Sequence, residues 1–180
     1  GVVFILLGIA CAPPSTFTDA PPETETGGES GSPVPTPVAP PLSIRDHLAL
    51  VASAESALEA DHAGLLEQYP DAFTDGAQAE GYLNAFLEVL GTASENAHVP
   101  NPAPELADTH QAYVDAINHL TEAVKVGTAD VAGAPSIPDF FESSGINAAF
   151  DELLDACEGI RAAGGADAEA AGLECNPLRP

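Results

Sequence analysis

The chain has 180 residues, enough for one domain or for one domain and a tail. It contains 28 acidic residues but only four Lys and Arg, which gives a formal net charge of −24. Nucleic acid is excluded as a partner because so negative a surface repels phosphate. Attachment to anionic lipid would have to be hydrophobic or covalent. The acids are scattered, which favours solubility over attraction of a cationic partner or metal ions.

Residues 1–10 form an apolar run that ends at Cys11. The run has about half of the ~20 residues that a membrane-spanning helix needs, and it matches the hydrophobic region of a signal peptide in length. The sequence contains no Met, and no Lys or Arg precedes Arg45. We therefore expect this to be a truncated signal peptide whose basic first part is missing.

The four residues Gly8-Ile9-Ala10-Cys11 resemble the lipobox of bacterial lipoproteins, with Gly8 where Leu is usual. The resemblance implies cleavage before Cys11 and a diacylglycerol joined to its sulfur, which would anchor the protein to a bacterial membrane outside the cytoplasm. Ordinary signal peptidase would cut before Pro13, which is poor substrate geometry because proline lacks an N–H and has a fixed φ. The remaining alternative is an anchor that spans the membrane.

Residues 11–41 are expected to be a disordered tether. From Ala12 to Pro41 the chain has nine prolines and three glycines, with Phe17 as its single aromatic residue. Such a composition cannot bury enough apolar surface to offset the entropy of ordering the chain. We interpret the segment as a stalk with polyproline character that holds a folded domain away from the membrane.

Residues 42–180 predict an all-α domain, most simply an up-down-up-down four-helix bundle. Apolar residues recur at intervals of three and four, and no stretch alternates as a strand would. Ser43 is a plausible N-cap, and prolines interrupt the pattern. The predicted helices span residues 43–69, 75–98, 104 to about 127, and 145–163, with a short piece at 137–144 leading into the last.

Two polar residues, Glu55 and His62, interrupt the apolar stripe of the first helix. Glu59 precedes His62 by three positions, a spacing that di-iron and di-manganese bundles use to direct both side chains to one metal. A divalent-metal site formed by Glu55, Glu59, His62 and His110, in an enzyme or a metal carrier, is the alternative hypothesis. The preferred interpretation leaves the Glu55 carboxylate in water and places His62 at the end of the bundle. We expect the other histidines (47, 98, 110 and 119) to be solvated.

The three cysteines predict a disulfide between Cys157 and Cys175. An odd number is awkward in an oxidising compartment, and acylation of Cys11 leaves these two to pair. Cys157 lies on the buried stripe of the last helix, and the chain after Gly164-Gly165 is long enough to run back to it. No nucleophile motif, phosphate loop or CxxC is present. The sequence therefore favours a non-enzymatic binding or structural role in the cell envelope, without a cofactor, with an envelope protein or a cationic molecule as partner.

Overall fold

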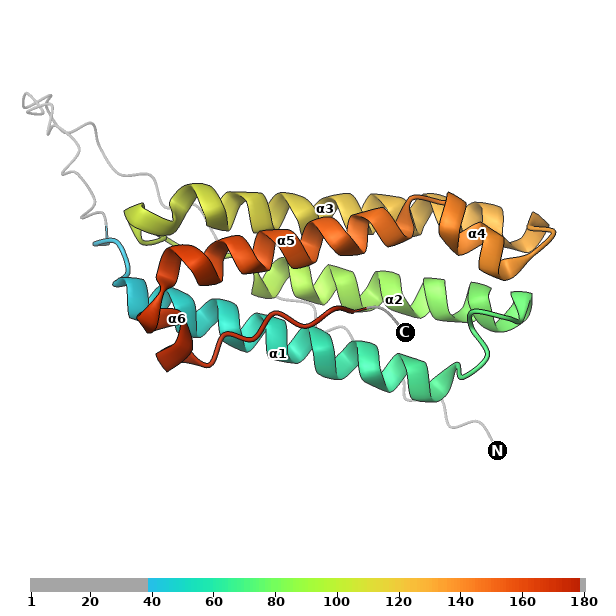
Figure 1. Ribbon diagram of the computed structural model, residues 1–180, viewed down its shortest axis with the longest axis horizontal. Coiled ribbons are helices and arrows are strands. Elements are labelled where there is room, and N and C mark those ends of the chain that lie inside the picture. The colour runs from blue at the N-terminus through green and yellow to red at the C-terminus, as the bar shows by residue number, and fades with distance from the viewer. Residues whose placement is uncertain (1–38, 179–180) are drawn as a thin grey trace, which may run out of the picture. The chain divides into compact units, whose positions relative to one another are not determined.

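The computed structural model describes residues 39–178, and every regular element in this part of the chain is a helix (Figure 1). The prediction of an all-α fold is confirmed. Residues 1–10, Cys11 and all but the last three residues of the predicted tether lie outside the described residues. The elements are α1 (Ile44–Gln68), α2 (Gly76–Asn96), η1 (Pro104–Leu106), α3 (Ala107–Asp130), η2 (Val131–Gly133), α4 (Ile137–Ser143), α5 (Ile146–Gly164) and α6 (Ala166–Ala171).

Side-chain caps begin three of the helices. Ser43 accepts a hydrogen bond from the backbone N–H of Asp46 at the start of α1. Asp75 does the same for Gln78 at the start of α2, and Ser136 for Asp139 at the start of α4. Each cap satisfies one of the N–H groups that the first turn of a helix leaves without a partner.

Helix α3 continues through Gly127 and ends at Asp130. Gly127 is buried against α5, and a Cβ added there would lie 2.7 Å from Ile146 Cδ1. The glycine that looked like a helix end from the sequence is therefore a point of close packing between two helices. The predicted helix at 145–163 is α5, and the short piece before it is α4.

The four long helices lie side by side and enclose the apolar core (Figure 1). Close packing joins α1 to α2, α2 to α3, and α3 to α5, whereas α1 and α5 do not pack closely together. Helix α6 contacts α1 and α5, and the chain after it runs between those two helices. The side chains of Tyr82, Phe86, Tyr113 and Leu120 are among those fully enclosed in the core.

The residues after α5 fold differently from the simple return that the sequence suggests. Gly165, with φ +53°, ends α5, and the alanine-rich stretch 166–171 then forms the short helix α6. Gly172, with φ +71°, ends that helix in the left-handed region, which glycine adopts without the usual steric cost. Only residues 173–178 run back along the domain in an extended form.

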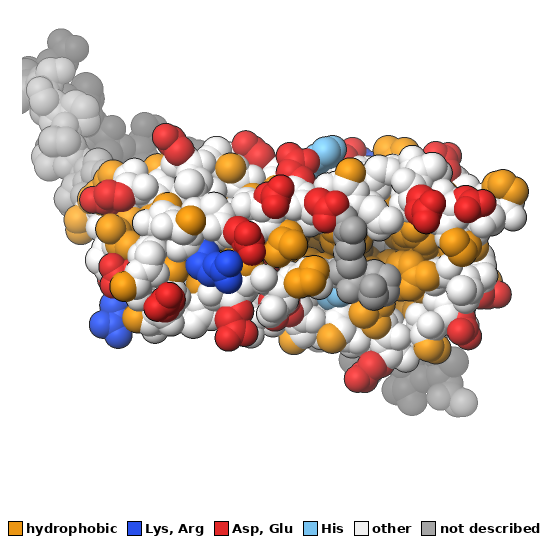
Figure 2. Space-filling model, in the orientation of Figure 1, with side chains coloured by type: hydrophobic (Ala, Val, Ile, Leu, Met, Phe, Trp, Pro, Cys, Tyr) orange, Lys and Arg blue, Asp and Glu red, His pale blue; other side chains and the backbone are white. Residues whose placement is uncertain are grey.

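The surface of the domain is acidic. On the face that Figure 2 shows, the Asp and Glu side chains, coloured red, are spread over the visible helices and are not gathered in one patch. Within residues 39–178, no helix combines the length and the apolar character needed to cross a lipid bilayer.

Candidate functional site: a buried polar line on helix α1

Three polar side chains of α1 are buried in the domain. His47 is 0 % exposed, and Glu55 and His62 are each 4 % exposed. They are spaced by eight and seven residues, which places them on one face of the helix, two turns apart. Because a buried polar group is costly unless it is paired, the partner of each side chain determines its role.

His62 is bonded to a tyrosine of α2. Its Nε2 lies 2.9 Å from the Tyr82 hydroxyl, and its ring also packs against Phe86 and Phe150. Burial lowers the pKa of His62, so the ring is neutral at neutral pH. The expectation that His62 lies at the end of the bundle is wrong, because the ring is enclosed in the aromatic core.

Glu55 is bonded to a tyrosine of α3. The Tyr113 hydroxyl donates to its carboxyl group, while Oε1 of the same group has no hydrogen-bond partner. Burial raises the pKa of Glu55 to about 7, with nearby Glu59 adding to the effect and the Tyr113 bond opposing it. The expectation that this carboxylate lies in water is therefore wrong. A carboxyl group with such a pKa can hold or release a proton near neutral pH.

A small cavity lies against the Glu55 carboxyl. Its volume is about 10 Å³, which is roughly the space of one water molecule. The cavity leaves no room for a substrate. The residues that line it come from α1, α5 and the C-terminal end: Glu55, Phe150, Leu153, Leu154, Cys157, Cys175, Asn176 and Leu178.

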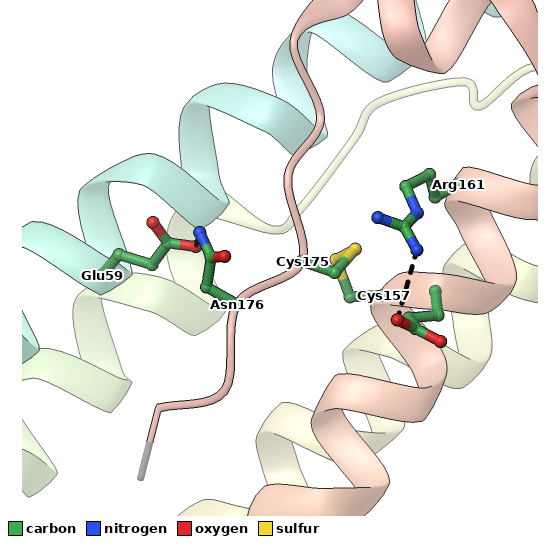
Figure 3. The surroundings of a disulfide bond; sticks show 6 residues. Glu59, Cys157, Arg161, Cys175 and Asn176 are labelled. Atoms are coloured by element: carbon green, nitrogen blue, oxygen red, sulfur yellow. Dashed lines mark hydrogen bonds and ion pairs between the residues drawn. A yellow bond between two sulfur atoms is a disulfide. The ribbon is translucent and has the colours of Figure 1, made fainter. Parts of the chain in front are cut away.

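The cavity is covered by residues 173–178, which we call the C-terminal strap. A disulfide joins Cys175 of the strap to Cys157 of α5, the pair that the sequence predicts, with their Cα atoms 5.8 Å apart (Figure 3). On the other side, Asn176 Nδ2 donates to Glu59 Oε1 of α1 over 2.9 Å. The strap therefore bridges the two long helices that do not pack closely together.

His47 lies near one end of the domain beside His110 of α3. Its Nδ1 accepts a hydrogen bond of 3.1 Å from the Ala103 N–H, so the proton of the neutral ring is on Nε2. His110 donates to the Ala97 carbonyl, and its Nδ1 is left as an acceptor. The two rings meet edge to face with centroids 4.6 Å apart, and neither His47 Nε2 nor His110 Nδ1 has a hydrogen-bond partner.

Both histidines of this pair are buried, so the expectation of solvated rings is wrong for them. Burial lowers the pKa of His47 to about 4, with His110 contributing, and it also lowers the pKa of His110. The pair holds the turn around Ala103 against α1. In this tautomer His47 Nε2 carries a proton, so the pair does not offer two lone pairs to a metal.

The structure does not bring the predicted metal ligands together. Among residues 39–178, no three His, Cys, Asp or Glu side chains form a group that could hold a metal ion. Glu59 bonds to the strap, and His110 pairs with His47. Glu55 and His62 each take a tyrosine hydroxyl instead.

A shallow hollow of about 870 Å³ lies on the surface between α1 and α2, and its lining mixes small residues such as Gly64 and Gly81 with larger ones such as Tyr69. Two of its polar side chains, Asn84 and Thr92, are hydrogen-bonded to carbonyls of their own helix. Each of these two side chains therefore already donates a hydrogen bond within α2.

Sequence reasoning missed Tyr82 and Tyr113, because a tyrosine at core spacing looks like an ordinary member of the apolar stripe of its helix. A usable signal was present. Each polar interruption of α1 needs a buried partner, and the chain contains only three tyrosines. His47 gave no such signal, since its partner is a backbone N–H in a distant turn.

Comparison of the chain with protein-family models, with curated proteins and with solved structures gave no match.

Proposed function

We propose that this chain is a lipid-anchored protein of the bacterial cell envelope, held outside the cytoplasm by Cys11 and a flexible stalk. Its helical domain, with an up-down-up-down four-helix bundle as its core, serves a binding or structural role without catalysis. The partner is an envelope protein or a cationic molecule, in keeping with the net charge of −24.

The cysteines carry this proposal. Disulfides persist in oxidising compartments and are rare in the cytosol, and Cys157 and Cys175 are bonded in the described domain. Cys11 is the third cysteine of the sequence, and it stands at the end of the lipobox-like stretch. Acylation of Cys11 leaves no free thiol in the chain.

The absence of room at the buried carboxyl supports a non-catalytic role. Glu55 is the described acid whose pKa is shifted toward neutrality, but its cavity holds no more than a water molecule. A general acid or base must come within hydrogen-bond reach of its substrate. Closed as it is, this site does not allow that approach.

The Cys11→Ser variant tests the anchor. Full-length protein expressed with its native leader is expected to partition into detergent and to sediment with membranes, whereas Cys11→Ser is expected to be released or left unprocessed. Cys175→Ser is the matched control, because it removes a cysteine without touching the anchor and should remain in the membrane fraction. Unchanged partitioning of Cys11→Ser would favour a membrane-spanning anchor instead.

A further inference from the structure

The two cysteines of the disulfide differ in their exposure to solvent. Cys157 is 2 % exposed on the inner face of α5, whereas Cys175 is only half-buried on the strap. Thiol–disulfide exchange begins when a thiolate attacks one sulfur of the bond, so access decides which sulfur is attacked. Cys175 is the more exposed residue of the pair, which favours attack on its side of the bond.

Few other interactions hold the strap. Its first residue, Leu173, donates its backbone N–H to Ala168, and within the described part of the chain no other backbone–backbone hydrogen bond involves residues 173–178. Leu173 and Leu178 are buried at the two ends of the strap, and Asn176 bonds to Glu59 on an exposed surface. The disulfide is therefore the main attachment of the middle of the strap.

A positively charged side chain lies one helical turn from Cys157. Arg161 follows Cys157 by four positions on α5, so the two residues lie on the same face of that helix (Figure 3). Its guanidinium is paired with Glu158 over 3.2 Å on the exposed side of α5. Among the four Lys and Arg of the chain, Arg161 is the cation nearest to Cys157 in sequence, and it is the group that would offset the negative charge of an attacking thiolate.

We propose that Cys157–Cys175 is an exchange site for a dithiol, and that its opening lifts the strap from the cavity at Glu55. One thiolate of the dithiol attacks Cys175 Sγ, which forms a mixed disulfide and releases Cys157 as a thiolate that takes up a proton. The second thiol of the dithiol, as a thiolate, then attacks the other dithiol sulfur, the one bonded to Cys175. This closes the dithiol into a disulfide and releases Cys175. The dithiol is oxidised to a disulfide, and the two cysteines of the chain are reduced to thiols.

The freed strap exposes an apolar channel between α1 and α5 with the unpartnered Glu55 Oε1 at its base. Phe150, Leu153 and Leu154 line one side of this channel. Water then reaches the carboxyl, which loses its burial. This inference concerns the described helical domain and is independent of the lipid anchor.

The test follows reduction of the full chain by dithiothreitol at neutral pH without denaturant. Quenched alkylation and mass spectrometry measure the rate at which the two thiols appear, and amide hydrogen exchange measures protection along the chain. We expect reduction in the folded state, faster exchange in residues 174–178, and unchanged exchange in α2 and α3. The pKa of Glu55, followed by carboxyl NMR, is expected to fall from about 7 toward its ordinary value.

Two charge variants separate an exchange site from a passive crosslink. Arg161→Gln is expected to slow reduction by about two- to fivefold, the effect of one exposed charge. Lys125→Gln is the matched control, since Lys125 forms the same kind of i,i+3 ion pair with Glu122 on the surface of α3. It should reduce at the wild-type rate. Reduction that proceeds only at the rate of global unfolding, or equal rates for wild type and Arg161→Gln, would overturn the proposal.

Discussion

The Cys175→Ser variant is expected to lower the free energy of unfolding by about 3 kcal/mol. The bond joins residues that are 18 apart in sequence. In the chain-entropy treatment, a crosslink that closes a loop of this length lowers the conformational entropy of the unfolded state, which raises the free energy of that state by about 3 kcal/mol. Urea unfolding of oxidised wild type and variant, followed by circular dichroism, gives the difference.

The double variant Cys157→Ser with Cys175→Ser provides the control. Both variants lack the bond, so the second substitution adds only the cost of placing a hydroxyl at the buried position of Cys157, about 1–3 kcal/mol when that hydroxyl finds no partner. Asn176→Ala removes the other link of the strap and should cost well under 1 kcal/mol, because its bond to Glu59 is exposed. A loss below 1 kcal/mol in Cys175→Ser would mean that the disulfide adds little to stability.

Acidification from pH 6.5 to pH 4 is expected to destabilise the domain through His47. The pKa of this ring is 6.5 when exposed and about 4 in the fold, so over this interval the unfolded chain binds a proton that the folded chain does not. Stability is therefore complete above pH 6.5 and is lost as the pH falls, by roughly 3 kcal/mol. His62 and His110, whose pKa values are also lowered, act in the same direction.

Protonation of Glu55 opposes this acid-induced loss of stability. Glu55 must therefore be replaced before the contribution of His47 can be measured. Its pKa is 4.5 when exposed and about 7 in the fold, so its contribution to stability is complete below pH 4.5 and is lost as the pH rises through 7. In the Glu55→Gln variant, the full decrease in the free energy of unfolding between pH 6.5 and pH 4 should be observed. Adding His47→Asn, which keeps an acceptor for the Ala103 N–H but does not titrate, should reduce that loss by most of 3 kcal/mol. Equal acid slopes with and without His47→Asn would show that His47 is not the group responsible.

The helices were predictable because their signals are local. Ser43 and Asp75 act as caps, Pro70 and Pro104 mark joints, and the apolar spacing identifies the buried faces. The same local reasoning failed after Gly165. There the composition of residues 166–171 permits both a helix and a return strand, and in the fold these residues form a helix that contacts α1.

The candidate site was harder to predict because its partners come from different helices. Glu55 and His62 were identified as unusual from their positions on the stripe, which is a local property. Glu55 bonds to Tyr113 and His62 bonds to Tyr82. These pairings depend on how the helices are rotated against each other, which the sequence of a single helix does not reveal. The odd cysteine count, in contrast, limited the pairing without any knowledge of packing, and the disulfide was found in advance.

The most direct test of the account is the intact mass of the full-length protein extracted from its native membrane, alkylated without reductant. We expect a chain that begins at Cys11, carries the added mass of a diacylglycerol on that residue, and gains no alkyl group, because Cys157 and Cys175 are bonded. A chain without lipid that gains one or more alkyl groups would contradict it.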